Sequence, residues 1–335
     1  MRIVTYNVEW FSNLFDRRGK LLEDGEPSSR FGVTRAEQLG ALGIVFTALN
    51  ADAVLIVEAP DHNSRRQTVP MLERFARHYG LRTRAALIGY ANETQQEIAL
   101  LYDPDVLRAR HDPQADAVPR FDTSYRIDLS TDAEPETVTF SKPPLEVAVL
   151  TKAGKRLRLI GVHIKSKAPH GAGSPEAAVR LAIENRRKQL AQCIWLRARV
   201  EQHLAAGDDL IVLGDFNDGP GIDEFEGLFG RSGVEIVLGE AAPPALRLRD
   251  PHAHAVLMHP TAAAPTSARF FLPEEGHFFT ALLDYVMLSP GLCALTPKWR
   301  IWHPFDDPVC YQTPELREAL LQASDHFPVS VDLAL

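Results

Sequence analysis

Short apolar runs and segments with helical period alternate along this chain. The apolar runs at residues 53–57, 98–102 and 210–213 are too short for helices and are typical of buried strands. A helix is predicted from Thr34, because Thr34 and Glu37 have the spacing of a capping box and apolar residues then recur every three or four positions. The pattern therefore predicts a mixed α/β protein.

Further elements follow from the same signals. We predict strands at residues 2–8, 282–288 and 329–335, and a hairpin with strands at 145–150 and 156–162. A second helix is expected over about residues 64–79, with Gly80 as its stop. The longest helix is expected to begin after Ser174, with Pro175 at its first position, and to run to His203. Strand and helix alternate only in the first half, which favours two sheets covered by helices over a doubly wound sheet.

Two segments lack a clear period, residues 112–144 and 240–271. The first is polar and contains prolines, and the second is rich in Ala, Pro and His, so we expect both to be long loops. The sequence contains no Gly/Ser linker and no internal repeat. We predict a single domain spanning residues 1–335.

Composition narrows the classes of function. With 36 Lys and Arg against 44 Asp and Glu, the formal net charge is −8, which disfavours a protein that binds nucleic acid by bulk charge but not a nuclease with a local basic groove. The three cysteines form no metal-binding spacing, which suggests reduced thiols. No signal peptide is visible and no apolar run approaches the roughly 20 residues of a membrane span. We therefore expect a cytoplasmic enzyme.

Polar residues stand repeatedly at the ends of the apolar strands. Burying a carboxylate is costly unless it is compensated, so this repetition predicts one shared polar site. Oxygen ligands without metal-spaced Cys indicate a hard cation, with Mg²⁺ expected and Mn²⁺ or Ca²⁺ as alternatives, whereas zinc is disfavoured because no HExxH motif is present. The residues concerned are Asn7, Glu9, Glu58, His163, Asp215, Asn217, Asp284, Asp325 and His326.

Six segments that carry these residues resemble, in the same order, the signature segments of the endonuclease/exonuclease/phosphatase superfamily. They are residues 6–10, 55–58, 161–166, 213–218, 283–286 and 324–328, of which the GDFN segment at 214–217 and SDHFP at 324–328 are the most specific. The segment beginning at Lys142 also resembles one that precedes a core strand in the family. The resemblance implies a four-layer α/β sandwich, in which two packed, mostly antiparallel sheets are flanked by helices.

The resemblance also implies roles. Glu58 would be the principal metal ligand, supported by Asn7 and Asp325, with Glu9 as a further candidate. His326, oriented by Asp284, would be the catalytic base or the histidine that contacts the phosphate. Asp215 and Asn217 would position the attacking water and a phosphate oxygen.

His163 resembles the second histidine of deoxyribonuclease I and of bacterial sphingomyelinases, and Glu97 matches the carboxylate that partners it. Two His–carboxylate pairs would then flank the scissile phosphate, and the sequence leaves open which pair activates water. Lys165 and Lys167 follow His163 and are expected to bind substrate. The basic residues Arg180, Arg186, Arg187 and Lys188 form either a basic lip or a solvated helix face.

The expected function is divalent-metal-dependent hydrolysis of a phosphodiester, with DNA or RNA as the substrate. An alternative is a sphingomyelinase-like enzyme or a phosphoesterase for inositol phosphates or other small phosphates, with phospholipid or a small ester as partner. A non-catalytic scaffold ranks lowest, because none of the expected catalytic residues is missing. Aromatic residues near positions 10–15 and 270–279 are expected mainly as core or loop anchors.

Overall fold

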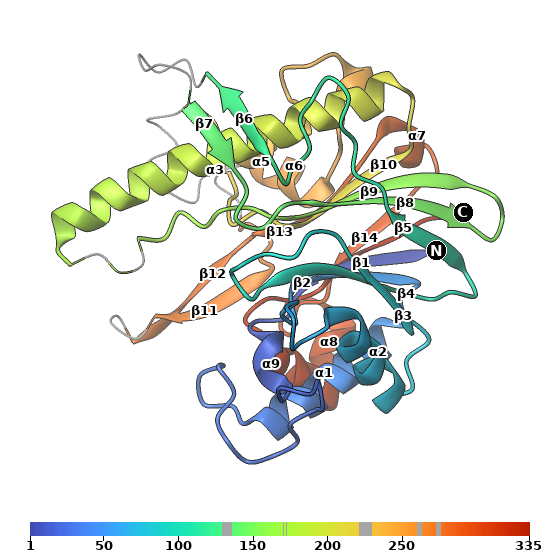
Figure 1. Cartoon of the computed structure of the whole chain (residues 1–335), viewed down its shortest axis with the longest axis vertical. Helices are drawn as coiled ribbons and strands as arrows, with labels where there is room; N and C mark the ends of the chain where they lie inside the picture. The colour runs from blue at the N-terminus through green and yellow to red at the C-terminus, as the bar shows by residue number, and fades with distance from the viewer. Residues whose placement is uncertain (129–135, 170, 172, 221–229, 260–262, 273–275) are drawn as a thin grey trace.

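The computed structural model describes residues 1–128, 136–169, 171, 173–220, 230–259, 263–272 and 276–335. Two large sheets face each other, with helices α1, α2, α8 and α9 outside one sheet and the long α3 outside the other (Figure 1). This is the four-layer α/β sandwich predicted above. No helix among the described residues is both long and apolar enough to cross a membrane.

The first sheet has the strand order β14-β15-β1-β2-β4-β3. Only β1 and β2 are parallel, and the other neighbours pair antiparallel. β15 stops at Asp332, short of the predicted residue 335. The strands are β1 Arg2–Asn7, β2 Ala53–Ala59, β3 Ala85–Ile88, β4 Glu97–Tyr102, β14 Lys298–Ile301 and β15 Val329–Asp332.

The second sheet has the order β13-β10-β9-β8-β5, again with one parallel pair, β10 and β9. The predicted hairpin is present as β8 and β9. Two further hairpins lie outside the large sheets. The second sheet consists of β5 Leu107–His111, β8 Leu145–Thr151, β9 Arg156–His163, β10 Leu210–Asp215 and β13 Asp284–Leu288, and the hairpins are β6 Ser124–Ile127 with β7 Glu136–Thr139 and β11 Ala268–Leu272 with β12 His277–Ala281.

The helices begin where side chains satisfy their first backbone N–H groups. The capping box predicted at Thr34 is present before α1, and the Ser174 hydroxyl accepts a hydrogen bond from the Ala177 N–H at the start of α3. α2 starts later than predicted, because the Asn63 side chain accepts the N–H groups of Arg65 and Arg66 in a turn. The helices are η1 Phe11–Leu14, α1 Arg35–Leu49, α2 Thr68–His78, α3 Pro175–Ala205, α5 Gly233–Leu238, η2 Pro244–Leu246, α6 Pro251–Met258, α7 Pro290–Cys293, α8 Pro308–Gln312 and α9 Pro314–Ala323.

The expectation of two long loops was wrong for large parts of both segments. The segment 112–144 contains β6 and β7, and residues 129–135 of it lie outside the described part. The segment 240–271 contains η2, α6 and most of β11. α6 escaped notice because its apolar residues have little amphipathic period, and its start depends on Asp250, whose side chain accepts the N–H groups of His252 and Ala253.

Alternation along the strands decides which residues lie between the sheets. On β10, Ile211 and Leu213 belong to the apolar core between the sheets, while Leu210 and Val212 pack toward α3. Side chains two positions apart share a face, so Asp215 continues the inner row beyond Leu213. The same parity holds for Asn7 on β1, His163 on β9 and Asp284 on β13, and it brings these polar residues together at one edge.

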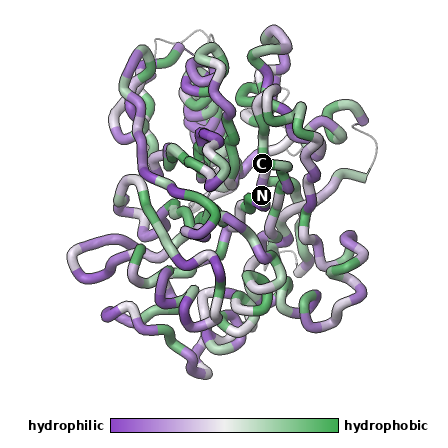
Figure 2. The backbone as a smooth tube through the Cα atoms, turned by 90° about the vertical axis from the view of Figure 1, so that its right-hand side faces the viewer, coloured by the Kyte–Doolittle hydropathy of each residue, from purple (hydrophilic) through white to green (hydrophobic). Residues whose placement is uncertain are grey.

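The two ends of the chain lie side by side (Figure 2). The backbone N–H of Leu333 donates to the Met1 carbonyl at 2.8 Å, and Arg2 forms an ion pair with Asp332 at 2.8 Å. β1 therefore has β2 on one side and β15 on the other, and the sheet is completed only by the last strand of the sequence.

The substitution Gly214→Ala is expected to destabilise the protein by roughly 3 kcal/mol or more. Gly214 has a φ of +141°, and a Cβ there would stand 2.0 Å from the Val162 carbonyl oxygen on β9. Urea unfolding would measure the change. Gly40→Ala in α1 is the matched control, because a Cβ there meets nothing within 4 Å and should stabilise the helix by up to about 1 kcal/mol. Equal stability of the Gly214→Ala variant and the wild type would contradict the packing described here.

Candidate active site

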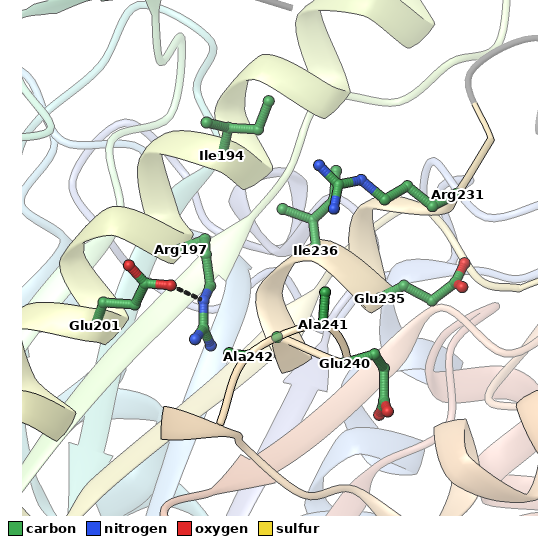
Figure 3. A pocket seen from close by; sticks show the side chains of 10 residues that line it. Ile194, Arg197, Glu201, Arg231, Glu235, Ile236, Glu240, Ala241 and Ala242 are labelled. Carbon is green, nitrogen blue, oxygen red and sulfur yellow. Dashed lines mark hydrogen bonds and ion pairs between the residues drawn. The ribbon is translucent and has the colours of Figure 1, made fainter. Parts of the chain in front are cut away.

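Two of the hollows in the described part of the structure differ in character. The smaller, about 410 Å³, lies between α3 and α5 around Arg197 (Figure 3). Arg197 pairs with Glu201 at 2.9 Å and donates to the carbonyls of Val237 and Leu246, so it fastens the end of α5 to α3. The larger is a cleft of about 1000 Å³ at the edge of the two sheets, and it is the one lined by the predicted site residues.

The strand register of the second sheet places three site residues in a row. Asp215, the last residue of β10, stands opposite His163 on β9 and opposite Asp284 on β13. All three side chains are almost completely buried and follow the parity that points between the sheets. The row is therefore a direct result of the pairing of three strands that end or begin at one edge.

Asn7 joins this row from the first sheet. Its side-chain amide donates to Asp215 Oδ2 at 3.1 Å, and its side-chain oxygen accepts the Glu9 N–H at 3.2 Å. Asp215 accepts two more hydrogen bonds from Asn217, from the backbone N–H at 2.7 Å and from the side-chain amide at 3.1 Å. Burial nevertheless raises the pKa of Asp215 to about 7, against the lowering effect of the nearby His326.

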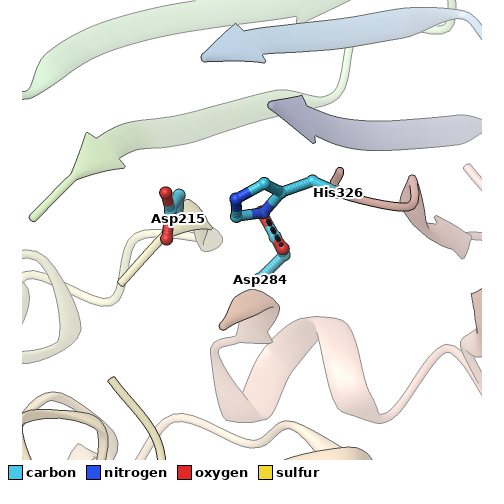
Figure 4. A group of neighbouring side chains, drawn as sticks. All are labelled: Asp215, Asp284 and His326. Carbon is cyan, nitrogen blue, oxygen red and sulfur yellow. Dashed lines mark hydrogen bonds and ion pairs between the residues drawn. The ribbon is translucent and has the colours of Figure 1, made fainter. Parts of the chain in front are cut away.

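His326 and Asp284 form the buried pair that the sequence predicted. His326 Nδ1 lies 2.7 Å from Asp284 Oδ2, and the other ring nitrogen lies on the side of Asp215 (Figure 4). Burial lowers the pKa of His326, but the carboxylates of Asp284, Asp215 and Asp325 outweigh it, so the pKa is raised well above its usual range. The Ser267 hydroxyl donates to Asp284 Oδ2 at 2.8 Å and accepts the N–H groups of Leu283 and Asp284.

The second predicted pair, His163 with Glu97, is not formed. Glu97 instead accepts hydrogen bonds from the His62 N–H at 3.2 Å and from the Asn92 side chain at 2.7 Å, and burial raises its pKa to about 7. The Lys142 ammonium lies 3.1 Å and 3.2 Å from the two ring nitrogens of His163. A lysine thus stands where a carboxylate was expected.

The charge state of His163 changes as a result. Burial, Lys142 and His326 together hold the pKa of His163 well below its usual range, so the ring is neutral near pH 7. Its closest acidic neighbour is Asp215, whose Oδ2 lies 3.6 Å from His163 Nε2. The surroundings therefore favour the protonated ring of His326 and the neutral ring of His163.

Glu58 reaches the cleft through an irregularity of β2. The pairing of β2 with β4 shifts between Val57 and Ala59, and Glu58 has a φ of +59°. Such a bulge turns the side chain away from the direction that strand alternation would give it. Glu58 Oε2 accepts the backbone N–H of Trp10 at 2.9 Å, and Trp10 and Asn217 also have positive φ values of 58° and 48°. Backbone strain is concentrated around this cleft.

Glu9 and Asp325 also line the cleft, and the Arg30 guanidinium acts on both. Glu9 forms a close ion pair with Arg30 and accepts the Asp325 N–H at 3.2 Å. Burial raises the pKa of Asp325, and so does the charge of Glu58, while His326 and Arg30 lower it. Glu9 is thus paired directly with Arg30, whereas Asp325 also feels the negative charge of Glu58.

The two predicted substrate lysines differ. Lys165 lines the cleft, and burial together with Lys188 lowers its pKa. Lys167 also lines the cleft but forms an ion pair with Asp218 at 2.9 Å. Arg186 is completely buried and pairs with the same Asp218 at 2.7 Å, so it belongs neither to a basic lip nor to a solvated face.

The donor set fits a hard cation. Glu58 and Asp325 both line the cleft, and the charge of Glu58 raises the pKa of Asp325, so a cation bound beside both oxygen ligands would offset their repulsion. Among the described residues, the group whose ligand atoms lie within 4.8 Å of one another is Asp215, Asp284 and His326. In that group His326 Nδ1 and Asp284 Oδ2 are already bonded to each other, so Glu58 and Asp325 are the better candidates for Mg²⁺, which needs only one or two carboxylates.

Three residues of the site were not predicted as functional. Lys142 was noted only as part of a segment that precedes a core strand, and nothing in its spacing pointed to His163. Ser267 and Arg30 lie in irregular segments, where no periodic signal locates a side chain. Each is close to the site only because of tertiary packing.

Comparison with known proteins shows which family and which solved structures this chain is similar to. The Endonuclease/Exonuclease/phosphatase family model matches residues 4–326. No curated protein matches the chain. Among solved structures, a humanized D. rerio TDP2 with 14 mutations is 12% identical with a TM-score of 0.51, covering 99% of this chain and 97% of that one. D. rerio TDP2 complexed with single strand DNA product is 11% identical, with a TM-score of 0.50 and the same coverage.

A third structure, the 3′ phosphatase NExo from Neisseria bound to product DNA hairpin, is 15% identical with a TM-score of 0.50, and the match covers 100% of both chains. At these identities, the likeness to all three structures shows the shared fold.

The variant Glu97→Gln is expected to keep turnover within about twofold of the wild type, because Glu97 binds the loop around Asn92 and not His163. It should also change the pH dependence of stability. The pKa of Glu97 is raised from 4.5 to about 7, so the wild type should lose stability as the pH rises across this range. The variant should lack that part of the loss, as measured by urea unfolding at several pH values.

His163→Asn serves as the comparison for turnover. A fall in the Glu97→Gln variant as large as that in His163→Asn would mean that Glu97 does orient His163.

Proposed function

The chain belongs to the Endonuclease/Exonuclease/phosphatase family, and we propose that this phosphoester hydrolase is a divalent-metal-dependent nuclease that cleaves phosphodiesters of DNA or RNA. The observation that carries the proposal is the row His163–Asp215–Asp284 with His326 bonded to Asp284, facing the carboxylates of Glu58 and Asp325 in one cleft.

Glu58 and Asp325, with the Asn7 side chain beside them, would hold the metal, for which we propose Mg²⁺, with Mn²⁺ or Ca²⁺ as alternatives. When bound, such an ion neutralises negative charge on the phosphoryl and leaving oxygens. Glu9 is less suited as a direct ligand because Arg30 already pairs with it. It would instead act on Asp325, whose N–H it accepts.

His326 would contact the phosphate. The bond from Nδ1 to Asp284 fixes the orientation of the ring and leaves Nε2 directed into the cleft. Asp284 is itself fixed by Ser267, so the pair is held on two sides. A protonated Nε2 at this place would stabilise the charge that develops on the phosphoryl oxygens.

Asp215 and Asn217 would position the attacking water. In the proposed step the water oxygen forms a bond to phosphorus, the ester P–O bond breaks, and the proton of the water passes to Asp215. The Asn7 and Asn217 amides hold the Asp215 carboxylate in place for this task. His163, kept neutral by Lys142, would accept or donate a hydrogen bond to the substrate but would not supply a charge.

Three lines support a nucleic acid substrate. Lys142, Lys165 and Lys167 line the cleft and suit a polyanion. The D. rerio TDP2 and Neisseria NExo structures contain product DNA. All three cysteines are free, consistent with the reducing cytoplasm, where nucleic acid substrates are available.

The function is tested by hydrolysis of supercoiled plasmid and of bis-p-nitrophenyl phosphate with EDTA, Mg²⁺, Mn²⁺ or Ca²⁺. We expect metal-dependent cleavage of both, and we expect His326→Ala to lower turnover at least about a hundredfold, because the group that stabilises charge on the phosphoryl oxygens is lost. His78→Ala, an exposed histidine on α2, is the control and should keep wild-type rates.

The outcomes separate the candidate substrates. Turnover of the diester without plasmid cleavage would move the substrate to a phospholipid or small phosphate ester. Silence toward both would contradict the phosphodiesterase assignment, and near-wild-type rates in His326→Ala would remove that residue from the mechanism.

Glu58→Gln is expected to raise the metal concentration needed for half-maximal activity by about tenfold or more, because one charged oxygen ligand is replaced by a neutral one. Titration of activity with Mg²⁺ measures this shift. Glu318→Gln on α9 is the control and should titrate like the wild type. A Glu58→Gln variant with an unchanged titration curve would show that Glu58 is not a ligand.

A further inference from the structure

An aromatic hairpin projects from the body of the protein beside the cleft. β11 and β12 form an isolated two-stranded sheet, in which Phe270 pairs with Phe279 and Phe271 with Phe278 (Figure 1). These aromatics were expected mainly as core or loop anchors, but Phe278 and Phe279 lie on a strand and are 45% and 40% exposed. The small core beneath the hairpin contains Ala268, Ala281 and Leu283, with Phe270 packed against it.

One face of the aromatic hairpin continues the wall of the cleft. Phe270 and Phe279 both line the cleft, and the Phe270 ring meets the His326 ring edge to face at a centroid distance of 5.5 Å. His326 also stands opposite Ala268 in an isolated bridge, in which the Arg269 N–H donates to the Asp325 carbonyl and the Phe327 N–H donates to the Ser267 carbonyl. The hairpin is therefore attached directly to the segment that carries the phosphate-contacting histidine.

The other face carries a short aromatic stack. Phe271 lies 5.2 Å from Phe278, and Phe31 stacks on Phe271 with centroids 5.0 Å apart and planes inclined by 18°. Phe31 is 77% exposed, so most of its ring faces solvent. The Arg269 guanidinium lies 3.4 Å from the centre of the Phe278 ring. Contiguous exposed aromatics of this kind mark a binding surface, because water contact with them is unfavourable.

We propose that the aromatic hairpin, together with Phe31, stacks against unpaired nucleobases that flank the scissile phosphate. This inference rests on the proposed phosphodiesterase function and adds a substrate class to it, strands whose bases are accessible. Aromatic rings beside a cationic groove are the usual means by which proteins hold single-stranded nucleic acid. The cationic groove is supplied by Lys142 and Lys165 in the adjoining cleft, and Arg269 adds a guanidinium plane to the aromatic surface.

A bilayer is less well matched to the same surface. The sequence that joins the two strands contains Glu274 and Glu275, and carboxylates are expelled from the apolar part of a membrane. Phe270 contacts His326, so the surface is continuous with the reaction site itself.

The test compares two fluorescein-labelled strands of equal length and charge, a single-stranded oligonucleotide and the same strand with abasic tetrahydrofuran units in place of nucleosides. Fluorescence anisotropy in EDTA at low salt measures binding without turnover. The wild type is expected to bind the base-bearing strand about tenfold more tightly. Phe31→Ala and Phe279→Ala should each reduce this ratio severalfold. Tyr311→Ala is the matched control, an exposed aromatic with an arginine, Arg317, over its ring, and it should keep the wild-type ratio.

Several outcomes would overturn the proposal: equal binding of the two strands, no binding of either, or a ratio that both phenylalanine variants leave unchanged. Sedimentation with phosphatidylcholine–sphingomyelin vesicles that is seen for the wild type and lost in Phe31→Ala would assign the hairpin to a membrane instead. Hydrolysis of bis-p-nitrophenyl phosphate, which has no nucleobase, is measured on the same preparations. It reports on the phosphodiesterase function separately from the base contacts.

Discussion

The buried carboxylate of Asp215 is the interaction on which this site depends. It lies between two sheets, where an unpaired charge would be prohibitively costly, and it is satisfied by amides from both sides of the interface, Asn7 on the first sheet and Asn217 on the second. These bonds fix the distance between the sheets at their edge. The neighbouring strands then have little freedom, so His163 and Asp284 must stand on either side of Asp215 in register.

Much of the site was predictable because strand alternation is a strong signal. The runs before Asn7, Asp215 and Asp284 are apolar, short and followed by a polar residue, so the layers and the inward parity follow from the sequence. The bulge at Glu58 could not be predicted in this way, since its positive φ depends on the pairing of β2 with β4 and on the bond from Trp10. The apolar run places Glu58 at the end of a strand but does not predict which face of the sheet its side chain points to.

The predicted pair of His163 and Glu97 was wrong because its formation depends on tertiary contacts, which the sequence pattern does not give. Glu97 lies at the expected edge of the sheet, but its carboxylate accepts a hydrogen bond from Asn92 in the loop before β4. Lys142, just before β8, contacts His163 instead. The expectation for the aromatic hairpin was wrong for a different reason. Apolar side chains suggest a buried face, but the sequence does not show whether another element packs on that face, and Phe278 is exposed.

The position of β15 has a consequence for synthesis of the protein. β1 and β2 are close in sequence and can pair early, but the other edge of β1 must wait for β15, some 330 positions later. Throughout translation that edge presents unpaired backbone groups, which can recruit strands of other chains. His326 also emerges with the last segment, so a nascent chain cannot assemble the phosphate site. A chain that has not yet reached β15 therefore has an open sheet edge and lacks His326 at the same time.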